Sequence, residues 1–173
     1  MIDTKSLKNI FKGDISLDEK TLDAYSTDAS IFRVTPQAVV FPKSTEDIRQ
    51  LVKWVVEKKK QGEHISLTGR SAGTDMSGGP LNDSIIVSFT KYFNHIKEIQ
   101  PPSANSIKQN KTHTDKLEYV GMLYSNPESA YAIVEPGVYF RDFEKELDSK
   151  GLLYPPYPAS KDLCALGGII NNN

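Results

Sequence analysis

The stretch that decides the fold is Thr68-Gly69-Arg70-Ser71-Ala72-Gly73-Thr74-Asp75-Met76-Ser77-Gly78-Gly79-Pro80. Its glycines and small hydroxyl residues cannot pack a core, and glycine allows positive φ angles that leave backbone N–H groups exposed. Successive exposed N–H groups form a nest for an anion, most often a phosphate. A long flexible loop between two strands has the same composition, so the residues alone leave both interpretations open.

The spacing within this stretch excludes two common phosphate-binding motifs. The GxxxxGK[ST] motif is absent because Gly69 and Gly73 are four residues apart and no lysine follows. The GxGxxG spacing is absent as well. Neither a P-loop nor a Rossmann fingerprint is therefore expected.

The residues on either side predict alternating strands and helices. Ser44 and Asp47 form a capping-box pattern at the start of an amphipathic helix, and Gly62 stands where a C′ glycine belongs. Residues 36–90 are therefore expected to form a first subdomain, a βαβ unit with a small sheet of parallel strands. The predicted strands are Ala38–Phe41, Ile65–Thr68 and Ile85–Phe89.

Two further regions lie outside this unit. Residues 1–35 are expected to be a helical appendage, since Leu7 and Phe11 recur at helical spacing among charged residues. Residues 91–173 are expected to form a second subdomain, a mixed or antiparallel sheet covered by a helix over 139–150. The prolines of 152–158 predict an extended track. Strands are expected at Ile96–Ile99, within 117–124, and at Ala130–Glu135.

Composition excludes several classes of protein. Lys and Arg number 21 against 22 Asp and Glu, and the net charge of −1 argues against a nucleic-acid binder. The single cysteine, Cys164, excludes an internal disulfide framework and a multi-cysteine zinc site, and no metal is expected. No apolar run approaches the ~18 residues of a membrane span, and the first twenty residues lack a signal-peptide core. A cytoplasmic chain is expected.

In order along the chain, the motifs resemble the FAD-binding domain of the vanillyl-alcohol oxidase / p-cresol methylhydroxylase superfamily. The resemblance is closest to the FAD-linked oxidases typified by D-lactate dehydrogenase and the glycolate oxidase flavoprotein subunit, and it covers residues 25–173. The motifs that carry it are the strand ending in Pro42, the capped helix, the glycine-rich loop, Asn94-x-Ile96, Pro136-Gly137-Val138, the Tyr-Pro-Pro track, and Gly167-Gly168 before asparagines.

The resemblance implies where an FAD would bind. The loop 69–79 would hold the pyrophosphate, with three hydroxyl groups as donors and Arg70 as a nearby charge. The 136–138 turn would approach the adenosine half, and residues 159–172 would run beside the diphosphate and the isoalloxazine. Cys164 is expected to be a buried packing residue rather than a redox thiol. The implied cofactor-binding residues are Gly69, Arg70, Ser71, Ala72, Gly73, Thr74, Asp75, Ser77, Gly78, Gly79, Pro136, Gly137, Val138, Pro158, Ala159, Ser160, Cys164, Gly167, Gly168 and Asn172.

Two departures from the family pattern affect the expectations. Some members attach FAD through a histidine in the glycine-rich loop, but this chain has Gly73-Thr74-Asp75 there, so a non-covalent FAD is expected. The chain also ends at Asn173, where the family continues. The expected fold is therefore α+β, a PCMH-type FAD-binding domain of two small α+β subdomains, truncated at its C-terminus. Substrate and electron acceptor would be contacted through the missing region.

By resemblance, the parent protein oxidises a small 2-hydroxy acid of the D-lactate or glycolate type by hydride transfer to flavin. No catalytic base and no arginine clamp for a carboxylate can be assigned, so the catalytic residues are unknown and the chain alone is expected to be inactive. Two alternatives remain open. The same fold could act on another alcohol, such as a sugar lactone, an aryl alcohol or an alkyl-glycerone phosphate, or the chain could be a flavin-holding module that needs a partner chain.

Overall fold

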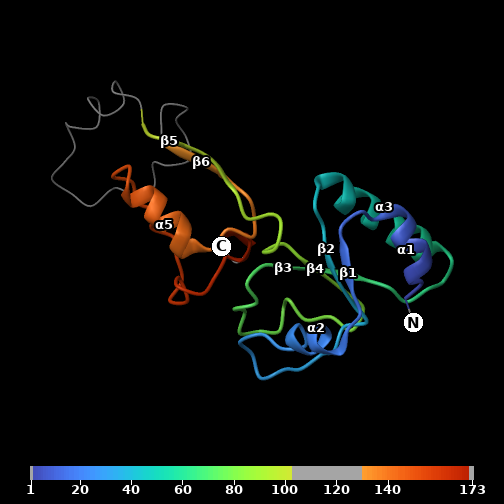
Figure 1. The fold of residues 1–173 in the computed structure, drawn as a ribbon. Coiled ribbons are helices and arrows are strands. Elements are labelled where there is room, and N and C mark those ends of the chain that lie inside the picture. Colours follow the sequence, from blue (N-terminus) through green and yellow to red (C-terminus); the bar gives the residue numbers. More distant parts are fainter. Residues whose placement is uncertain (1, 103–129, 172–173) are drawn as a thin grey trace.

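The computed structural model describes residues 2–102 and 130–171 and shows an α+β fold with two sheets, as expected (Figure 1). The first sheet has the strand order β1-β2-β4-β3, and the second pairs β5 with β6. The strands are β1 (Asp14–Ser16), β2 (Ala38–Phe41), β3 (Leu67–Arg70), β4 (Ile85–Ser88), β5 (Ile96–Gln100) and β6 (Tyr131–Val134). The helices are α1 (Thr4–Ile10), α2 (Glu19–Ala24), α3 (Thr45–Lys60), α5 (Phe140–Asp148) and α6 (Leu166–Asn171).

The centre of the first sheet consists of three parallel strands. Strand β4 lies between β2 and β3 and pairs in parallel with both, so that Val39 and Thr68 both lie opposite Ile86. All four residues of β4 are buried. A continuous apolar run of this kind is typical of a parallel strand covered on both faces. The predicted βαβ arrangement is therefore present, with β3 starting at Leu67 rather than at Ile65.

Helix α3 begins and ends as its sequence predicts. The Ser44 hydroxyl accepts a hydrogen bond from the Asp47 N–H at 3.1 Å, which completes the capping box. At the other end Gly62 has a φ of 84°, and the Glu63 N–H donates to the Lys58 carbonyl at 3.1 Å. This pattern is a Schellman motif, which satisfies carbonyls that the helix leaves unpaired.

The N-terminal segment is more than the helical appendage that was expected. Strand β1 joins the first sheet as an antiparallel edge beside β2, and α1 lies against α3 (Figure 1). Leu7 is fully buried and Phe11 is 4% exposed, both in the core cluster beneath α3. The helical spacing of these residues was read correctly, but spacing alone does not reveal what a side chain packs against.

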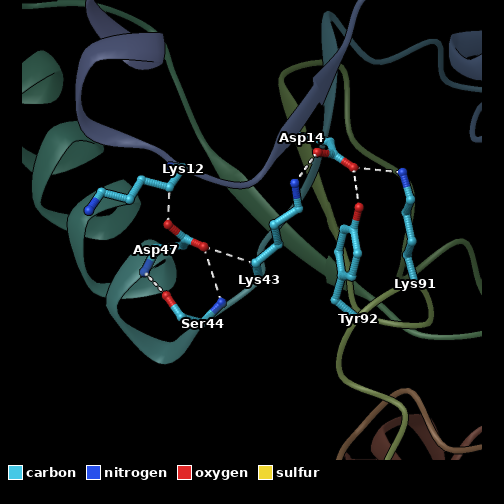
Figure 2. Close-up of polar contacts among 7 residues, drawn as sticks. All are labelled: Lys12, Asp14, Lys43, Ser44, Asp47, Lys91 and Tyr92. Carbon is cyan, nitrogen blue, oxygen red and sulfur yellow. Dashed lines mark hydrogen bonds and ion pairs between the residues drawn. The ribbon is translucent and has the colours of Figure 1, made fainter.

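Two carboxylates attach this segment to the sheet (Figure 2). Asp47, buried at the start of α3, accepts backbone N–H groups from Lys12 at 3.1 Å, Lys43 at 2.9 Å and Ser44 at 3.1 Å. Asp14 in β1 contacts the Lys43 and Lys91 ammonium groups, each at 2.6 Å, and the Tyr92 hydroxyl at 2.5 Å. These contacts join β1 to the segments that follow β2 and β4.

The second sheet is antiparallel and is covered by α5, as predicted. Phe143 and Leu147 of α5 are buried in a second apolar cluster, against which Ala132 and Val134 of β6 pack. In Figure 1 this half of the molecule lies to one side and β1–β4 with α1 and α3 to the other. Residues 152–158 have no helix or strand, in agreement with the predicted extended track. The strand expected within 117–124 lies outside the described residues.

In the described part of the chain, no helix is long and apolar enough to cross a membrane.

Candidate functional site

The glycine-rich loop starts at the carboxyl end of a parallel strand. Gly69 and Arg70, expected within the loop, are the last two residues of β3, and the loop proper covers 71–79. Strands β2 and β4 end at the same edge of the sheet because they run parallel to β3. Ligands of open α/β sheets bind outside the carboxyl ends of the strands, so the loop occupies a favourable place for a ligand.

Three predicted segments meet at the carbonyl group of Pro136. The Ser71 hydroxyl donates to this oxygen at 3.0 Å, and the Gly167 N–H donates to it at 2.9 Å. A Cβ on Gly167 would lie 2.8 Å from the same oxygen and 2.6 Å from the Ser71 Oγ. The glycine-rich loop, the Pro136 turn and α6 are therefore in contact, although they lie far apart in the sequence.

The turn after Pro136 also makes a close backbone contact. The Gly137 N–H donates to the Phe93 carbonyl at 2.7 Å, and a Cβ on Gly137 would lie 2.6 Å from the same oxygen. Gly137 and Val138 are buried. Glycine is required at position 137 because a side chain would displace the backbone of the segment after β4.

Two of the three hydroxyl groups expected to donate to phosphate already donate within the protein. Ser71 donates to Pro136, and the Ser77 hydroxyl donates to the Asp75 carboxylate at 2.6 Å. The Ser77 hydroxyl and N–H together hold the pKa of Asp75 below its usual value. The Thr74 hydroxyl has no hydrogen bond within the described ranges 2–102 and 130–171, so it is available to a ligand.

Arg70 is buried and bonded to the segment that precedes the loop in sequence. Its side chain is 8% exposed in total, and its guanidinium donates to the carbonyls of Thr27 at 2.8 Å and Tyr25 at 3.3 Å. It also stacks on the Tyr25 ring at 5.0 Å. Burial lowers the pKa of this guanidinium. Among the described residues, Arg70 forms no ion pair.

The predicted residues 158–160 belong to a turn that leads to Cys164. Pro158 and Ala159 are exposed, and the Ser160 carbonyl accepts the Cys164 N–H at 2.9 Å. Over the described residues, no hydrogen bond or ion pair joins 158–160 to the glycine-rich loop. Cys164 is 3% exposed in the second cluster, and burial raises the pKa of its thiol, as suits the packing role that was expected. Asn172 lies outside the described residues.

A pocket of about 480 Å³ lies beside the Pro136 turn. The His95 ring contacts the Glu135 carboxylate at 2.8 Å, and Lys97 contacts the same group at 3.0 Å. Burial raises the pKa of Glu135, but the hydrogen bonds from His95 and Lys97 outweigh it and hold this pKa below its usual value. The pocket is lined by Asn94, His95, Ile96, Gly137, Val138, Tyr139, Asp142 and Glu146.

Glycines shape the backbone of the loop and leave open space on α6. Gly73 and Gly78 have φ angles of 71° and 84°, in the left-handed region that favours glycine. A Cβ on Gly168 would have nothing within 4 Å, although Gly167 beside it is tightly packed. The exposed Gly168 therefore borders open space next to the Pro136 junction.

Sequence reasoning missed the hairpin at residues 26–34 that lies along the loop. Thr27 and Arg33 form an isolated antiparallel bridge, and the Val34 N–H donates to the Ser26 carbonyl at 2.8 Å. The cluster of small polar residues Ser26–Ser30 is a turn signal that could have separated this hairpin from the helix before it.

A family model described as "FAD binding domain" matches residues 36–173. The chain is 28% identical to a D-2-hydroxyglutarate dehydrogenase of Pseudomonas putida over 94% of its length, which is 13% of that protein. It is 29% identical to the glycolate oxidase subunit GlcD of Bacillus subtilis over 86% of its length and 26% of that protein. The chain thus spans only a fraction of the relatives it matches.

Solved structures show the same fold. An alkyldihydroxyacetonephosphate synthase superposes on 95% of this chain and 28% of its own with a TM-score of 0.65 at 15% identity. A p-cresol methylhydroxylase superposes on 92% of this chain and 26% of its own with a TM-score of 0.57 at 20% identity. The PCMH-type fold expected from the sequence is therefore confirmed.

The residues at the carboxyl edge of the sheet fit a dinucleotide. The loop has backbone N–H groups and the Thr74 hydroxyl, which are donors of the kind that bind phosphate, and a Cβ on Gly168 would meet no protein atom within 4 Å. Matched over residues 36–173, the chain belongs to the family of FAD binding domains found in flavin-dependent oxidoreductases, and its cofactor is FAD.

Proposed function

We propose that this chain is the FAD-binding part of an oxidoreductase that acts on a small 2-hydroxy acid. The observation that carries the proposal is the junction at the Pro136 carbonyl, which gathers the glycine-rich loop, the Pro136 turn and α6 into one site. Each of these three segments was assigned to FAD by resemblance. Bound FAD supplies the acceptor for hydride.

The chain's own residues would bind and orient the cofactor. The N–H groups of 71–74 and the Thr74 hydroxyl would donate to the pyrophosphate, and Gly168 would lie beside the ring system. The adenosine half would lie at the Pro136 turn, beside the pocket. There the carboxylates of Asp142 and Glu146 could accept from an adenine amino group. The absence of histidine at 73–75 supports a non-covalent cofactor.

The substrate class rests on the relatives. Two of the relatives that match are a D-2-hydroxyglutarate dehydrogenase and a glycolate oxidase subunit, and each of these names includes a 2-hydroxy acid. The structural neighbours act as evidence for the fold alone because their identities are 15% and 20%. A 2-hydroxy acid is therefore favoured over an aryl alcohol or a sugar lactone.

The test is a visible absorption spectrum of the purified chain after incubation with excess FAD and desalting. We expect flavin bands to remain, and acid precipitation to release the flavin into the supernatant because no covalent bond holds it. Flavin that precipitates with the protein would contradict the non-covalent assignment. A chain that retains no flavin would contradict FAD binding by these residues.

Two glycine substitutions provide a matched control. Gly73→Ala and Gly62→Ala both place a side chain at a positive φ, 71° and 84° respectively, so both introduce backbone strain. Gly73 lies in the loop, whereas Gly62 ends α3 and has open space around it. We expect Gly73→Ala to reduce FAD retention and Gly62→Ala to leave it unchanged. Equal losses would mean that strain, not the loop, determines binding.

One observation favours a second candidate, a flavin-holding module that works with a partner chain. The Bacillus subtilis relative is named as a subunit of glycolate oxidase. In an assay with glycolate or D-2-hydroxyglutarate and a dye acceptor, the FAD-loaded chain alone would stay inactive. Turnover restored by a separate polypeptide would support this candidate, whereas turnover gained only by extending the same chain would support the first.

A further inference from the structure

The hairpin at residues 26–34 contacts the glycine-rich loop at three successive places. At its first strand, the Thr27 carbonyl accepts from the Arg70 guanidinium at 2.8 Å. In the middle, the Ala29 N–H donates to the Asp75 carbonyl at 3.1 Å. At the far end, the Phe32 ring lies 3.0 Å from where a Cβ on Gly78 would stand. The hairpin therefore runs along the loop from its start to its end.

The hairpin is held in shape by its own hydrogen bonds. The Asp28 carboxylate accepts the Ser30 N–H at 2.8 Å, and the Ser30 hydroxyl accepts the Phe32 N–H at 3.1 Å. The bridge between Thr27 and Arg33 closes its base. A segment that is ordered by local bonds can act as a fixed support for a loop that has many glycines of its own.

Of the three contacts, the one made by Arg70 includes the largest number of interactions. Its planar guanidinium lies on the Tyr25 ring at 5.0 Å and donates to two carbonyls. The guanidinium also contacts Gly73, since a Cβ there would lie 2.6 Å from the Arg70 Cζ. Only glycine can therefore approach the guanidinium this closely, and the guanidinium in turn fixes the place at which Gly73 turns the chain. Tyr25 is anchored in its turn, because its hydroxyl lies 2.8 Å from the Ser88 Oγ in β4.

We infer that Arg70 is a positioning residue, which holds the glycine-rich loop against the 26–34 hairpin in the shape that binds the cofactor's phosphates, and that it is not itself a phosphate ligand. The inference rests on the proposed function for the identity of the ligand. The coupling between hairpin and loop is a property of the chain without FAD. A lysine cannot replace the arginine here because it lacks both the planar stacking surface and the forked donors.

The test uses the whole chain with Arg70→Lys and Arg70→Gln, and Arg49→Lys on the exposed face of α3 as the matched control. FAD affinity is measured by flavin fluorescence over a range of salt concentrations, and amide hydrogen exchange of residues 71–79 is measured without FAD. We expect both Arg70 variants to bind FAD at least about tenfold more weakly. We also expect residues 71–79 to exchange faster, and Arg49→Lys to match the parent in both measurements.

Salt dependence separates positioning from direct contact. Removal of a phosphate-binding charge weakens the dependence of affinity on salt, because the lost attraction was the part that salt screened. We expect Arg70→Gln to show the parent's salt dependence at a lower affinity. A flattened dependence, together with near-parent affinity in Arg70→Lys, would show that Arg70 contacts phosphate and would overturn the inference.

A second pair of variants covers the case in which Arg70 substitutions unfold the chain. Phe32→Ala removes the hairpin's contact with Gly78, and Ile31→Ala changes the neighbouring side chain, which is 96% exposed. We expect faster exchange in 71–79 for Phe32→Ala alone. Unchanged exchange in every hairpin and Arg70 variant would refute the coupling. If the parent chain fails to bind FAD, the proposed function fails, while the exchange results still decide the coupling.

Discussion

At the scale of single residues, glycines that the resemblance assigned to the cofactor serve different purposes. Gly137 is surrounded by backbone, since a Cβ would lie 2.6 Å from the Phe93 carbonyl oxygen, whereas a Cβ on Gly168 would meet no protein atom within 4 Å. We expect Gly137→Ala to lower the free energy of unfolding by about 1–3 kcal/mol, the usual result of overpacking. Urea denaturation of Gly137→Ala and of the parent chain measures this loss of stability.

Gly168→Ala is the informative counterpart, because its effect should fall on the cofactor alone. We expect this variant to unfold at the parent's urea concentration or slightly above, since alanine favours a helix and Gly168 lies in α6. Its FAD affinity should fall, as the new methyl group enters the space assigned to the cofactor. Parent-like affinity would mean that FAD does not lie beside α6.

Sequence analysis located these glycines but could not distinguish their roles. The resemblance assigned both Gly167 and Gly168 to the cofactor, yet Gly167 is needed by the protein itself, where a Cβ would lie 2.6 Å from the Ser71 Oγ. The same limit applies to Arg70. Its place in the motif indicated a charge near phosphate, and only the fold shows that its guanidinium reaches the carbonyls of Tyr25 and Thr27.

At the scale of elements, local signals were predicted well and long-range packing was not. The capping box of α3 and the turn at Gly62 were predicted because both depend on neighbours in the sequence. Strand β1 was missed because it has three residues and only one, Ile15, is apolar. Its place in the sheet depends on contacts with β2 and with the segment after β4 that no local pattern records.

Asp47 makes the link between the N-terminal segment and α3 testable. Its buried carboxylate accepts three backbone N–H groups, and an asparagine would present an NH₂ group to at least one of those donors. We expect Asp47→Asn to lower the free energy of unfolding by about 1–3 kcal/mol. Glu46→Gln, one position earlier and exposed, is the control and should unfold like the parent. Equal midpoints for the two variants in urea would contradict the assigned role.

The Asp14 cluster predicts a dependence of stability on acid. Hydrogen bonds from Lys43, then from Lys91 and Tyr92, hold the pKa of Asp14 far below the ordinary value of 3.8. A carboxyl whose pKa is lower in the folded state stabilises the fold above its unfolded pKa, and this stabilisation is lost as the pH falls. We expect the parent chain to lose stability below about pH 4.

Replacing this carboxylate should weaken the acid dependence. Asp14→Asn should be less stable than the parent at neutral pH and should lose less stability between pH 5 and about pH 2, because the titrating group is gone. Thermal unfolding across this pH range is the measurement. Asp83→Asn is the control, since Asp83 is exposed and its side chain accepts no hydrogen bond among the described residues. An unchanged acid slope in Asp14→Asn would rule out this cluster as a source of the dependence.

At the scale of the whole molecule, the described residues form two apolar clusters, and each cluster has a natural probe. Its single tryptophan, Trp54, packs against the first cluster, and its single cysteine, Cys164, is buried in the second. Within residues 2–102 and 130–171 the second cluster is built on a two-stranded sheet, and small sheets of this kind are marginally stable alone. Without FAD we therefore expect Cys164 to react with a thiol reagent at urea concentrations where Trp54 fluorescence is still native.

FAD should bring the two transitions together. A cofactor bound at the Pro136 junction contacts segments from both halves, so unfolding of either half requires its release. Binding stabilises the folded state by RT ln(1 + [L]/Kd), which is about 2.7 kcal/mol at a hundredfold excess over Kd. We expect saturating FAD to raise both urea midpoints, the Cys164 midpoint more than the Trp54 midpoint, until they coincide. Riboflavin, which lacks the pyrophosphate and the adenosine, should produce a much smaller shift. If FAD protects Cys164 while the Trp54 midpoint stays where it was, the cofactor is held by the second half alone, and the glycine-rich loop is not part of its site.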